Sequence, residues 1–274
     1  MNPFETLLIN PILNLLIALY LFLHSLGIPG ALGLAIILLS TSIRLALWSL
    51  TSTQLRSAQK MAALKPHLER IKAEYGHDKM RHQQEISKLH KEHGINPLSG
   101  CLPLLLQLPI FIGLYNVLSQ VLQFDKADFL ANINSRLYSP ALHLADKPDT
   151  SFLGTSLSTS PNQWQEAGFI ILAVPIATGL LQFIQSKMMV PQAAPHAVQR
   201  SDDKKADMTD TMSQVQSQMT YIMPAMIAFF SYGFPIGLSL YWNTFTVIGI
   251  IQQYIISGPG ALSKYLPKRL QKSN

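Results

Sequence analysis

Long apolar runs constrain this chain more than any other feature of its sequence. Residues 31–50, 98–122, 167–190 and 219–256 carry almost no charge, and the last run is long enough for two spans. A helix needs about 20 mostly apolar residues to cross the hydrocarbon core of a bilayer. With 48% hydrophobic and only 13% charged residues, the chain is also too apolar for an ordinary soluble domain. The sequence therefore predicts an all-α polytopic membrane protein.

We predict a core of five transmembrane helices within residues 29–257, preceded by an N-terminal apolar helix in residues 1–28. The predicted spans are residues 31–50, 97–122, 167–189, 219–233 and 236–256. In the N-terminal segment, the apolar stretch from Ile12 to Leu26 is short for a span. We expect it to lie in the outer membrane interface, with a short sixth span as the alternative.

The distribution of basic residues predicts the topology. Residues 51–96 contain nine Lys and Arg, whereas residues 123–166 contain three against five acidic residues. Residues 187–213 contain four basic residues, as does the tail, residues 258–274. Because Lys and Arg concentrate in cytoplasmic segments, loop 123–166 is predicted outside and loop 190–213 and the tail inside. The N-terminus is then outside and the C-terminus cytoplasmic. The basic excess reflects this topology alone, or in addition contact with ribosomal RNA or anionic lipids.

Residues 51–95 are predicted to form a cytoplasmic helical hairpin. Apolar residues recur every three or four positions from Leu55 to Tyr75, and Pro66 is expected to kink or restart the first helix. Asp78 is a candidate N-cap for the second helix, and Gly94 ends it. The segment also holds five histidines, which we expect on a solvated face because no carboxylate or thiol completes a metal shell: His67, His77, His82, His90 and His93.

Arg44 lies about two thirds of the way along the first predicted span. A cation at that depth costs about 2.5–3.5 kcal/mol, and such residues usually serve a function. No Asp or Glu occurs in any of the five predicted spans, so Arg44 has no intramembrane counter-ion within them. Two interpretations remain open. Its side chain reaches the cytoplasmic interface, about 10 Å away, or it lies in a hydrated cavity that lowers the cost of moving polar peptide into the membrane.

Polar residues in the spans favour the cavity. Ser40 and Thr41 lie one turn before Arg44 on its helical face. The other polar candidates are Gln107, Asn116, Gln182, Gln185, Asn243, Thr244 and Thr246.

The sequence contains no pattern typical of an enzyme. It has no nucleophile–base pair, no glycine-rich phosphate loop and no metal-ligand spacing. The single cysteine, Cys101, rules out an intrachain disulfide. We therefore expect a non-enzyme with no cofactor and no metal.

Several motifs, in this order, resemble those of the YidC/Oxa/Alb family of membrane protein insertases, over residues 28–253. They are the Arg44 span, the charged hairpin, residues 96–103 (NPLSGCLP) with 107–111 (QLPIF), residues 182–188 (QFIQSKM), and Met223-Pro224 followed by residues 235–242 (PIGLSLYW) and Gln252-Gln253. The resemblance is to shorter bacterial members without a large periplasmic domain, and we expect the bacterial plasma (inner) membrane as the location.

The resemblance implies a five-helix core around a groove that is open to cytoplasm and lipid and closed outside. The groove arginine of the family maps onto Arg44, the small polar position before it onto Ser40, and the client-contacting aromatic position onto Trp242, beside Tyr241. Together with polar residues of the spans, the expected client-binding groove comprises Arg44, Ser40, Thr41, Gln107, Gln182, Tyr241, Trp242 and Asn243.

The function implied is insertion and chaperoning of client membrane proteins. The expected partners are nascent membrane proteins, membrane lipids, the ribosome through the hairpin and basic tail, and a Sec-type translocon, but not DNA. Two alternatives remain: an anion transporter or channel that uses Arg44 as its binding charge, and a structural partner of a translocation channel.

Overall fold

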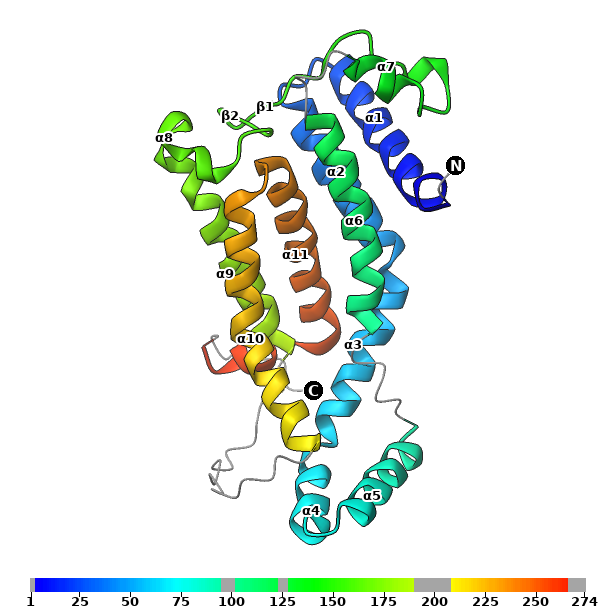
Figure 1. The fold of residues 1–274 in the computed structure, drawn as a ribbon, viewed down its shortest axis with the longest axis vertical. Coiled ribbons are helices and arrows are strands. Elements are labelled where there is room, and N and C mark those ends of the chain that lie inside the picture. The colour runs from blue at the N-terminus through cyan, green and yellow to red at the C-terminus, as the bar shows by residue number, and fades with distance from the viewer. Residues whose placement is uncertain (1–2, 95–101, 123–127, 190–207, 266–274) are drawn as a thin grey trace. The chain divides into compact units, whose positions relative to one another are not determined.

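The computed structural model describes residues 3–94, 102–122, 128–189 and 208–265 (Figure 1). Part of the motif at 96–103, most of loop 190–213 and the end of the basic tail lie outside these residues. The chain divides into two compact units, which we describe separately. Unit 1 comprises Met1–Leu47, Leu104–Leu181 and Ala225–Ile248; unit 2 comprises Trp48–Pro103, Gln182–Pro224 and Gly249–Asn274.

Helices make up most of the described residues. The α-helices are α1 (Asn10–Ser25), α2 (Ala31–Ala46), α3 (Trp48–Ala63), α4 (Lys65–Tyr75), α5 (Lys79–Glu92), α6 (Leu102–Leu122), α7 (Phe129–Asn134), α8 (Trp164–Ala167), α9 (Ala173–Met189), α10 (Met208–Gly233) and α11 (Ile236–Ser257). Short helical turns are η1 (Glu5–Ile9), η3 (Pro140–Leu142), η4 (Pro161–Gln163), η5 (Phe169–Leu172) and η6 (Gly260–Tyr265). Strands β1 (Ser151–Phe152) and β2 (Thr155–Ser156) pair antiparallel.

The N-terminal helix of unit 1 is longer than the predicted apolar stretch. A π-helical turn, η1, leads directly into α1, so that the helix runs from Glu5 to Ser25 and is long and apolar enough to cross a membrane. Gly30, with φ of +69°, supplies the left-handed residue from which α2 starts. Helices α1 and α2 then pack side by side (Figure 1).

The first predicted span differs from the structure at its end. Helix α2 ends at Ala46, and a break at Leu47 separates it from α3. In unit 2, the Gln252 amide donates hydrogen bonds to the Trp48 carbonyl oxygen at 3.0 Å and to the Thr51 hydroxyl at 2.7 Å. A side chain distant in sequence thus holds the first turn of α3. Neither Gly nor Pro occurs in residues 42–52, so nothing in the local sequence predicts the break.

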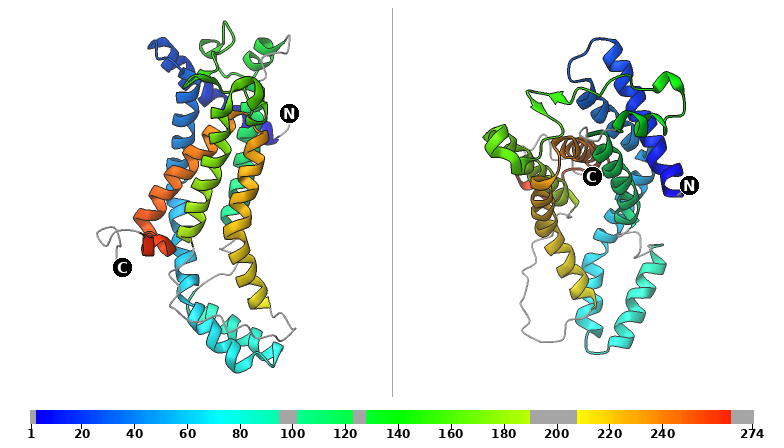
Figure 2. Two further views of the ribbon diagram at one scale, coloured as in Figure 1. Left: turned by 90° about the vertical axis from the view of Figure 1, so that its left-hand side faces the viewer. Right: turned by 45° about the horizontal axis from the view of Figure 1, so that its top comes forward.

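The hydrophobic core of unit 1 is built mainly from α1, α2, α6 and the first half of α11. Its largest fully buried side chains are Leu13, Leu16, Ile17, Leu32, Ile36, Leu39, Leu114, Leu118, Ile133, Leu157, Ile171 and Tyr241. The segment 128–168 crosses one end of this unit (Figure 2). It is tied to the start of α11 because Gly237 donates its N–H to the Leu157 carbonyl at 2.9 Å.

Helices α9 and α10 expose large apolar side chains, as expected for surfaces that face lipid. The exposed fractions reach 70% at Ile176 and 74% at Phe229. Among the described residues, two helices are long and apolar enough to span a membrane, Glu5–Ser25 and Phe169–Met189. A third is added if α2 and the first part of α3 count as one broken span. The all-helical membrane fold agrees with the sequence, whereas the five-span count stays a prediction.

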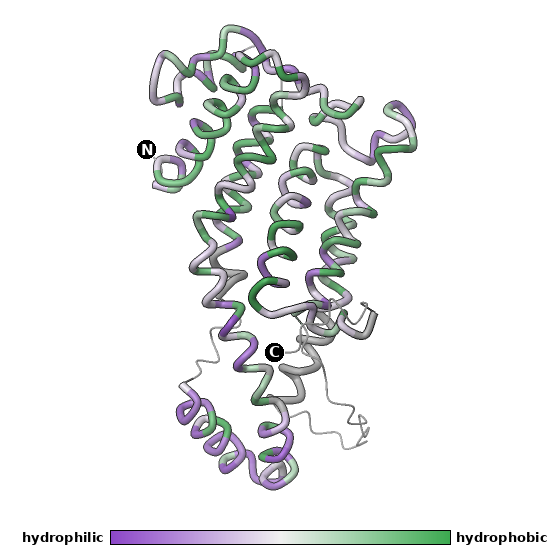
Figure 3. The backbone as a smooth tube through the Cα atoms, turned by 180° about the vertical axis from the view of Figure 1, so that it is seen from behind, coloured by the Kyte–Doolittle hydropathy of each residue, from purple (hydrophilic) through white to green (hydrophobic). Residues whose placement is uncertain are grey.

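In unit 2, α4 and α5 are hydrophilic helices that contact each other (Figure 3). Pro66 lies in the first turn of α4, and Asp78 caps α5 by accepting hydrogen bonds from the Met80 and Arg81 N–H groups, both at 3.1 Å. These two local predictions are confirmed. The prediction of a solvated face for the histidines is wrong at His82, which is only 2% exposed, because the side of α5 that carries it is covered.

Candidate functional site

Arg44 lies in the last turn of α2 and is 7% exposed. A cation is favoured in this turn by the partial negative charge of the helix C-terminus. The guanidinium carbon lies 4.5 Å from the centre of the Phe245 ring in α11. A desolvated cation–π contact of this kind contributes about 2 kcal/mol. The side chain is therefore enclosed within unit 1 and held by an aromatic face.

Arg44 is only partly satisfied in this position. Its Nε is buried and has no hydrogen-bond partner among the residues that the structure describes. Helices α2, α6, α9 and α11 contain no Asp or Glu. The chain thus keeps a buried positive charge with no carboxylate on these helices to neutralise it.

Helices α6 and α11 meet through two contacts one turn apart. Gln107 donates a long hydrogen bond, 3.4 Å, to the Tyr241 hydroxyl. Phe111 packs edge-on against Trp242, with ring centres 5.3 Å apart. Tyr241 also contacts Phe245, at 5.8 Å between ring centres. The aromatic residues of α11 thus connect α6 to the ring that lies against Arg44.

The three other polar residues of the predicted groove that lie in unit 1, Ser40, Thr41 and Asn243, differ in their surroundings. The Ser40 hydroxyl donates to the Ile36 carbonyl at 2.6 Å, and the Thr41 hydroxyl donates to the Ile37 carbonyl at 2.8 Å. Both bonds are internal to α2, so neither hydroxyl proton is directed at Arg44. The Oδ1 atom of Asn243 is buried and lacks a hydrogen-bond partner within the described residues.

Seven of the eight predicted groove residues thus belong to unit 1. Gln182 belongs to unit 2, where its side chain is half-buried. We refer to those seven residues and Phe245 as the Arg44 site. The list is Ser40, Thr41, Arg44, Gln107, Tyr241, Trp242, Asn243 and Phe245.

Phe245 is a member of the site that the sequence did not predict. One signal was available, because Phe245 follows Tyr241 by one helical turn and therefore shares its face. A second omission is a set of three hydroxyls that join α9, α10 and α11 within unit 1. The Ser231 hydroxyl bonds to the Thr178 hydroxyl at 3.3 Å and to the Ser239 hydroxyl at 2.9 Å. Small polar residues of this kind hold helices together in membranes.

The Arg44 site is suited to transient binding rather than to bond chemistry. Within the described part of the chain, no three His, Cys, Asp or Glu residues gather in a way that could hold a metal ion. The site combines a buried cation, an amide oxygen without a hydrogen-bond partner among the described residues, and a row of aromatic rings. Trp242 and Phe245 are half-buried and can contact an apolar helix, whereas Tyr241 is fully buried. The guanidinium can attract an acidic or polar group.

Comparison with known proteins places the chain in a family. The model of the 60Kd inner membrane protein family matches residues 21–261. The chain belongs to this family. It is 33% identical over 232 residues to the membrane protein insertase YidC of Rickettsia conorii and, equally, to that of Rickettsia prowazekii. Each match covers 84% of this chain and 36% of the relative, so the chain spans about a third of the length of these insertases.

A solved structure agrees with the family assignment. The crystal structure of an active YidC insertase with its first transmembrane domain resolved matches with a TM-score of 0.52 and 25% sequence identity. That match covers 93% of this chain and 47% of the other. The resemblance to the YidC/Oxa/Alb insertases is therefore confirmed, and the 60Kd family member described here shares their fold.

Proposed function

We propose that this protein is a membrane protein insertase and chaperone of the bacterial inner membrane, and not an enzyme. Its clients are nascent membrane proteins whose helices pass along the Arg44 site into the lipid. The insertase names of its relatives support this function, and the buried, incompletely bonded Arg44 is the observation in this chain that carries it.

The proposed mechanism uses two parts of the site, the apolar aromatic rings of α11 and the polar region around Arg44 and Asn243. A client helix packs along Trp242 and Phe245 on α11, whose rings are half-buried and remain partly accessible. Gln182, which belongs to unit 2, is also proposed to contact clients. The polar segment ahead of that helix is drawn toward Arg44, where water around Asn243 and the guanidinium lowers its desolvation cost. The hydrophobic effect then moves the client helix into lipid, because lipid solvates its apolar surface better than the polar site does.

The proposed topology has five spans, the N-terminus outside and the C-terminus in the cytoplasm. Contacts along α1 support an interfacial place for this helix. Asn14 donates to the Arg136 carbonyl at 3.0 Å and accepts the Tyr138 N–H at 2.7 Å, and η3 also contacts α1. Since residues 123–166 form the predicted outer loop, these bonds hold α1 against the outer face.

Further partners follow from charge and are part of the proposal. Helices α4 and α5 form the cytoplasmic hairpin that recruits clients or regulates their access. The ribosome contacts this hairpin and the basic tail, and a Sec-type translocon acts beside the insertase for some clients. The alternating charges of α4 and α5 and their exposure to solvent support this assignment.

Reconstitution tests the function directly. The purified chain is placed in liposomes without a Sec-type channel, and insertion of a single-span client is measured by protease protection of its translocated tail. Clients with acidic and neutral tails are compared for wild-type protein and Arg44→Ala. We expect Arg44→Ala to reduce insertion of the acidic client by about tenfold and that of the neutral client by less, since one charge-assisted contact contributes about 1.5–3 kcal/mol.

Lys147→Ala serves as the control because Lys147 is an exposed cation of unit 1 that is not part of the Arg44 site. Failure of the wild-type protein to insert either client refutes the insertase. Specific anion flux without any client identifies the transporter alternative instead. Equal losses for acidic and neutral clients refute charge attraction while leaving insertion in place.

A further inference from the structure

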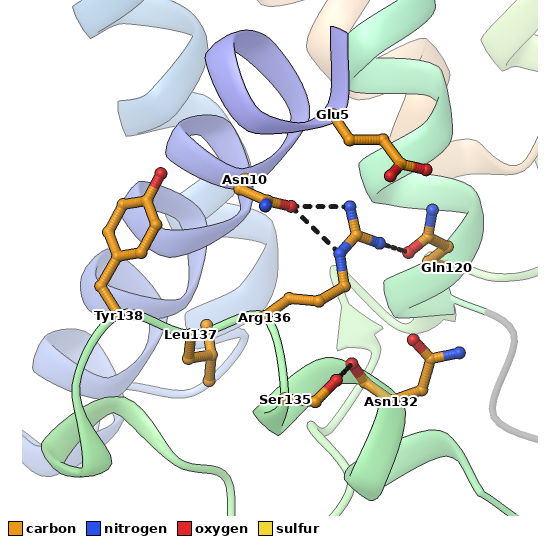
Figure 4. Close-up of a pocket in the computed structure, with 8 residues that line it drawn as sticks. All are labelled: Glu5, Asn10, Gln120, Asn132, Ser135, Arg136, Leu137 and Tyr138. Carbon is orange, nitrogen blue, oxygen red and sulfur yellow. Dashed lines mark hydrogen bonds between the residues drawn. The ribbon is translucent and has the colours of Figure 1, made fainter. Parts of the chain in front are cut away.

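A polar pocket of about 670 Å³ lies in unit 1, remote from the Arg44 site in sequence (Figure 4). It is formed where the start of the N-terminal helix, the last turn of α6 and the segment after α7 come together. The lining includes one cation, Arg136, and one carboxylate, Glu5, with the amides of Asn10 and Gln120. Nothing in the proposed insertion mechanism uses these residues.

Neutral side chains hold the guanidinium of Arg136 in place. Its Nε and one terminal nitrogen donate to the Asn10 amide oxygen, at 3.1 and 2.8 Å, and the other terminal nitrogen donates to the Gln120 amide oxygen (Figure 4). A guanidinium has five N–H groups, so these three bonds leave two donors for a ligand, counted over the described residues. The positive charge is fixed in orientation but not cancelled by its two partners. Phosphate oxygens match such a fork.

Glu5 supplies the opposite charge on the wall of the same pocket. Its side chain is exposed and points toward the space beside Arg136 and Gln120 (Figure 4). A ligand that carries a phosphate alone would meet the Glu5 carboxylate as a like charge. A ligand that carries both a phosphate and an ammonium group complements both walls.

The N-terminal helix, which supplies Glu5 and Asn10 to the pocket, also carries exposed apolar side chains. Leu7 and Leu15 are 79% and 41% exposed, and Tyr138 at the rim is 65% exposed. Tyrosine is enriched at the boundary between lipid and water because its ring is apolar and its hydroxyl is polar. Lipid tails can pack on these exposed apolar side chains, whereas a small water-soluble ion gains nothing from them.

We propose that this pocket binds the headgroup of a zwitterionic aminophospholipid, with its phosphate on Arg136 and its primary ammonium on Glu5. The bound lipid fastens α1 and the segment after α7 to the outer leaflet. The assignment rests on the fork of Arg136, on the carboxylate of Glu5 in the same pocket and on the exposed leucines of the N-terminal helix.

Binding is measured with the full chain purified in detergent. The probes are short-chain phosphatidylethanolamine, phosphatidylglycerol and phosphatidylcholine, together with glycerophosphoethanolamine and inorganic phosphate. Apparent Kd values come from the concentration dependence of the thermal midpoint, and native mass spectrometry counts the bound lipids. Phosphatidylethanolamine is expected to bind about tenfold more tightly than phosphatidylglycerol, since the latter lacks the ammonium that pairs with Glu5.

Two variants measure separately what the charges of Arg136 and Glu5 contribute to lipid binding. Arg136→Gln is expected to weaken phosphatidylethanolamine binding about tenfold. Because Arg136 also joins α1 to α6, the midpoint of this variant without lipid checks its fold. Glu5→Gln changes an exposed side chain that makes no described hydrogen bond, and it should bring phosphatidylethanolamine and phosphatidylglycerol to within about twofold of each other. Lys147→Gln, in the same segment but outside the pocket, should change nothing.

The proposal is overturned by equal binding of all three lipids to the wild-type chain, or by a lipid preference that Glu5→Gln leaves intact. An equal midpoint shift with inorganic phosphate alone identifies a free-anion site and also overturns it. Insertion activity is read separately in liposomes, so loss of lipid selectivity and loss of insertion are distinguishable.

Discussion

The effect of Phe245→Leu on stability, compared between the wild-type protein and Arg44→Met, tests whether the aromatic ring holds the buried cation. The distance of 4.5 Å between the guanidinium carbon and the ring centre, with Arg44 only 7% exposed, corresponds to a desolvated cation–π contact of about 1–2 kcal/mol. Phe245→Leu removes the ring and keeps an apolar side chain. It should therefore destabilise the wild-type protein more than it destabilises Arg44→Met.

The assay is a double-mutant cycle on thermal unfolding in detergent. Four proteins are compared: wild type, Arg44→Met, Phe245→Leu and the double variant. A coupling of about 1–2 kcal/mol corresponds to a difference of roughly 2–8 °C between the two effects of Phe245→Leu. Phe245→Tyr is the control that keeps the ring face, and it should retain most of the coupling.

Arg44→Met alone should leave the thermal midpoint unchanged or raise it. The Nε of Arg44 is buried with no hydrogen-bond partner in the described part of the chain, so an apolar side chain of similar length relieves a desolvation cost. Insertion should fall in the same variant. Additive single effects, with a coupling below about 0.5 kcal/mol, would refute the cation–π argument.

Three further predictions concern the supporting structure. A Cβ at Gly33 would lie 2.2 Å from the Phe152 ring, so Gly33→Ala should lower the thermal midpoint, and Phe152→Ala in the same protein should restore part of the loss. Asp78→Ala removes the cap of α5 and should cost about 1 kcal/mol, visible as faster hydrogen exchange in α5 while the rest of the chain is unaffected. Hydrogen bonds from Ser151 lower the pKa of Asp149 from its ordinary value. The stability they contribute is therefore present above about pH 4 and lost as the pH falls through the lowered pKa; the midpoint of Asp149→Asn should depend less on pH in that range.

The local sequence was sufficient to predict where several helices begin and end. Helix α10 ends at Gly233 and α11 begins at Ile236, as the Gly-Phe-Pro turn between them predicts. Asp78 begins α5 because its side chain satisfies the N–H groups of the first turn. Helix α10, in contrast, begins at Met208, eleven residues before the predicted span, since a polar sequence can be helical and still lie outside an apolar window.

The amino-acid sequence is sufficient to establish the class of the protein and to identify its unusual buried cation. Apolar runs of spanning length require helices, because backbone groups in lipid must be bonded within the segment. One arginine in the first run, without an acidic residue in the others, already identified Arg44 as the residue to explain. Motifs in a fixed order indicated the family.

The way in which Arg44 is accommodated follows from packing between helices and cannot be derived from the sequence. The partner of its guanidinium is a ring about 200 positions away in the chain. In unit 2, the first turn of α3 is held by Gln252, again far along the sequence. The pocket of Arg136 and Glu5 also joins three distant segments. Hydrophobic periodicity specifies which face of a helix is buried, but not which residues of another helix meet that face. Those pairings depend on packing between helices, and it is the packing that places an aromatic ring, rather than a carboxylate, against the buried charge.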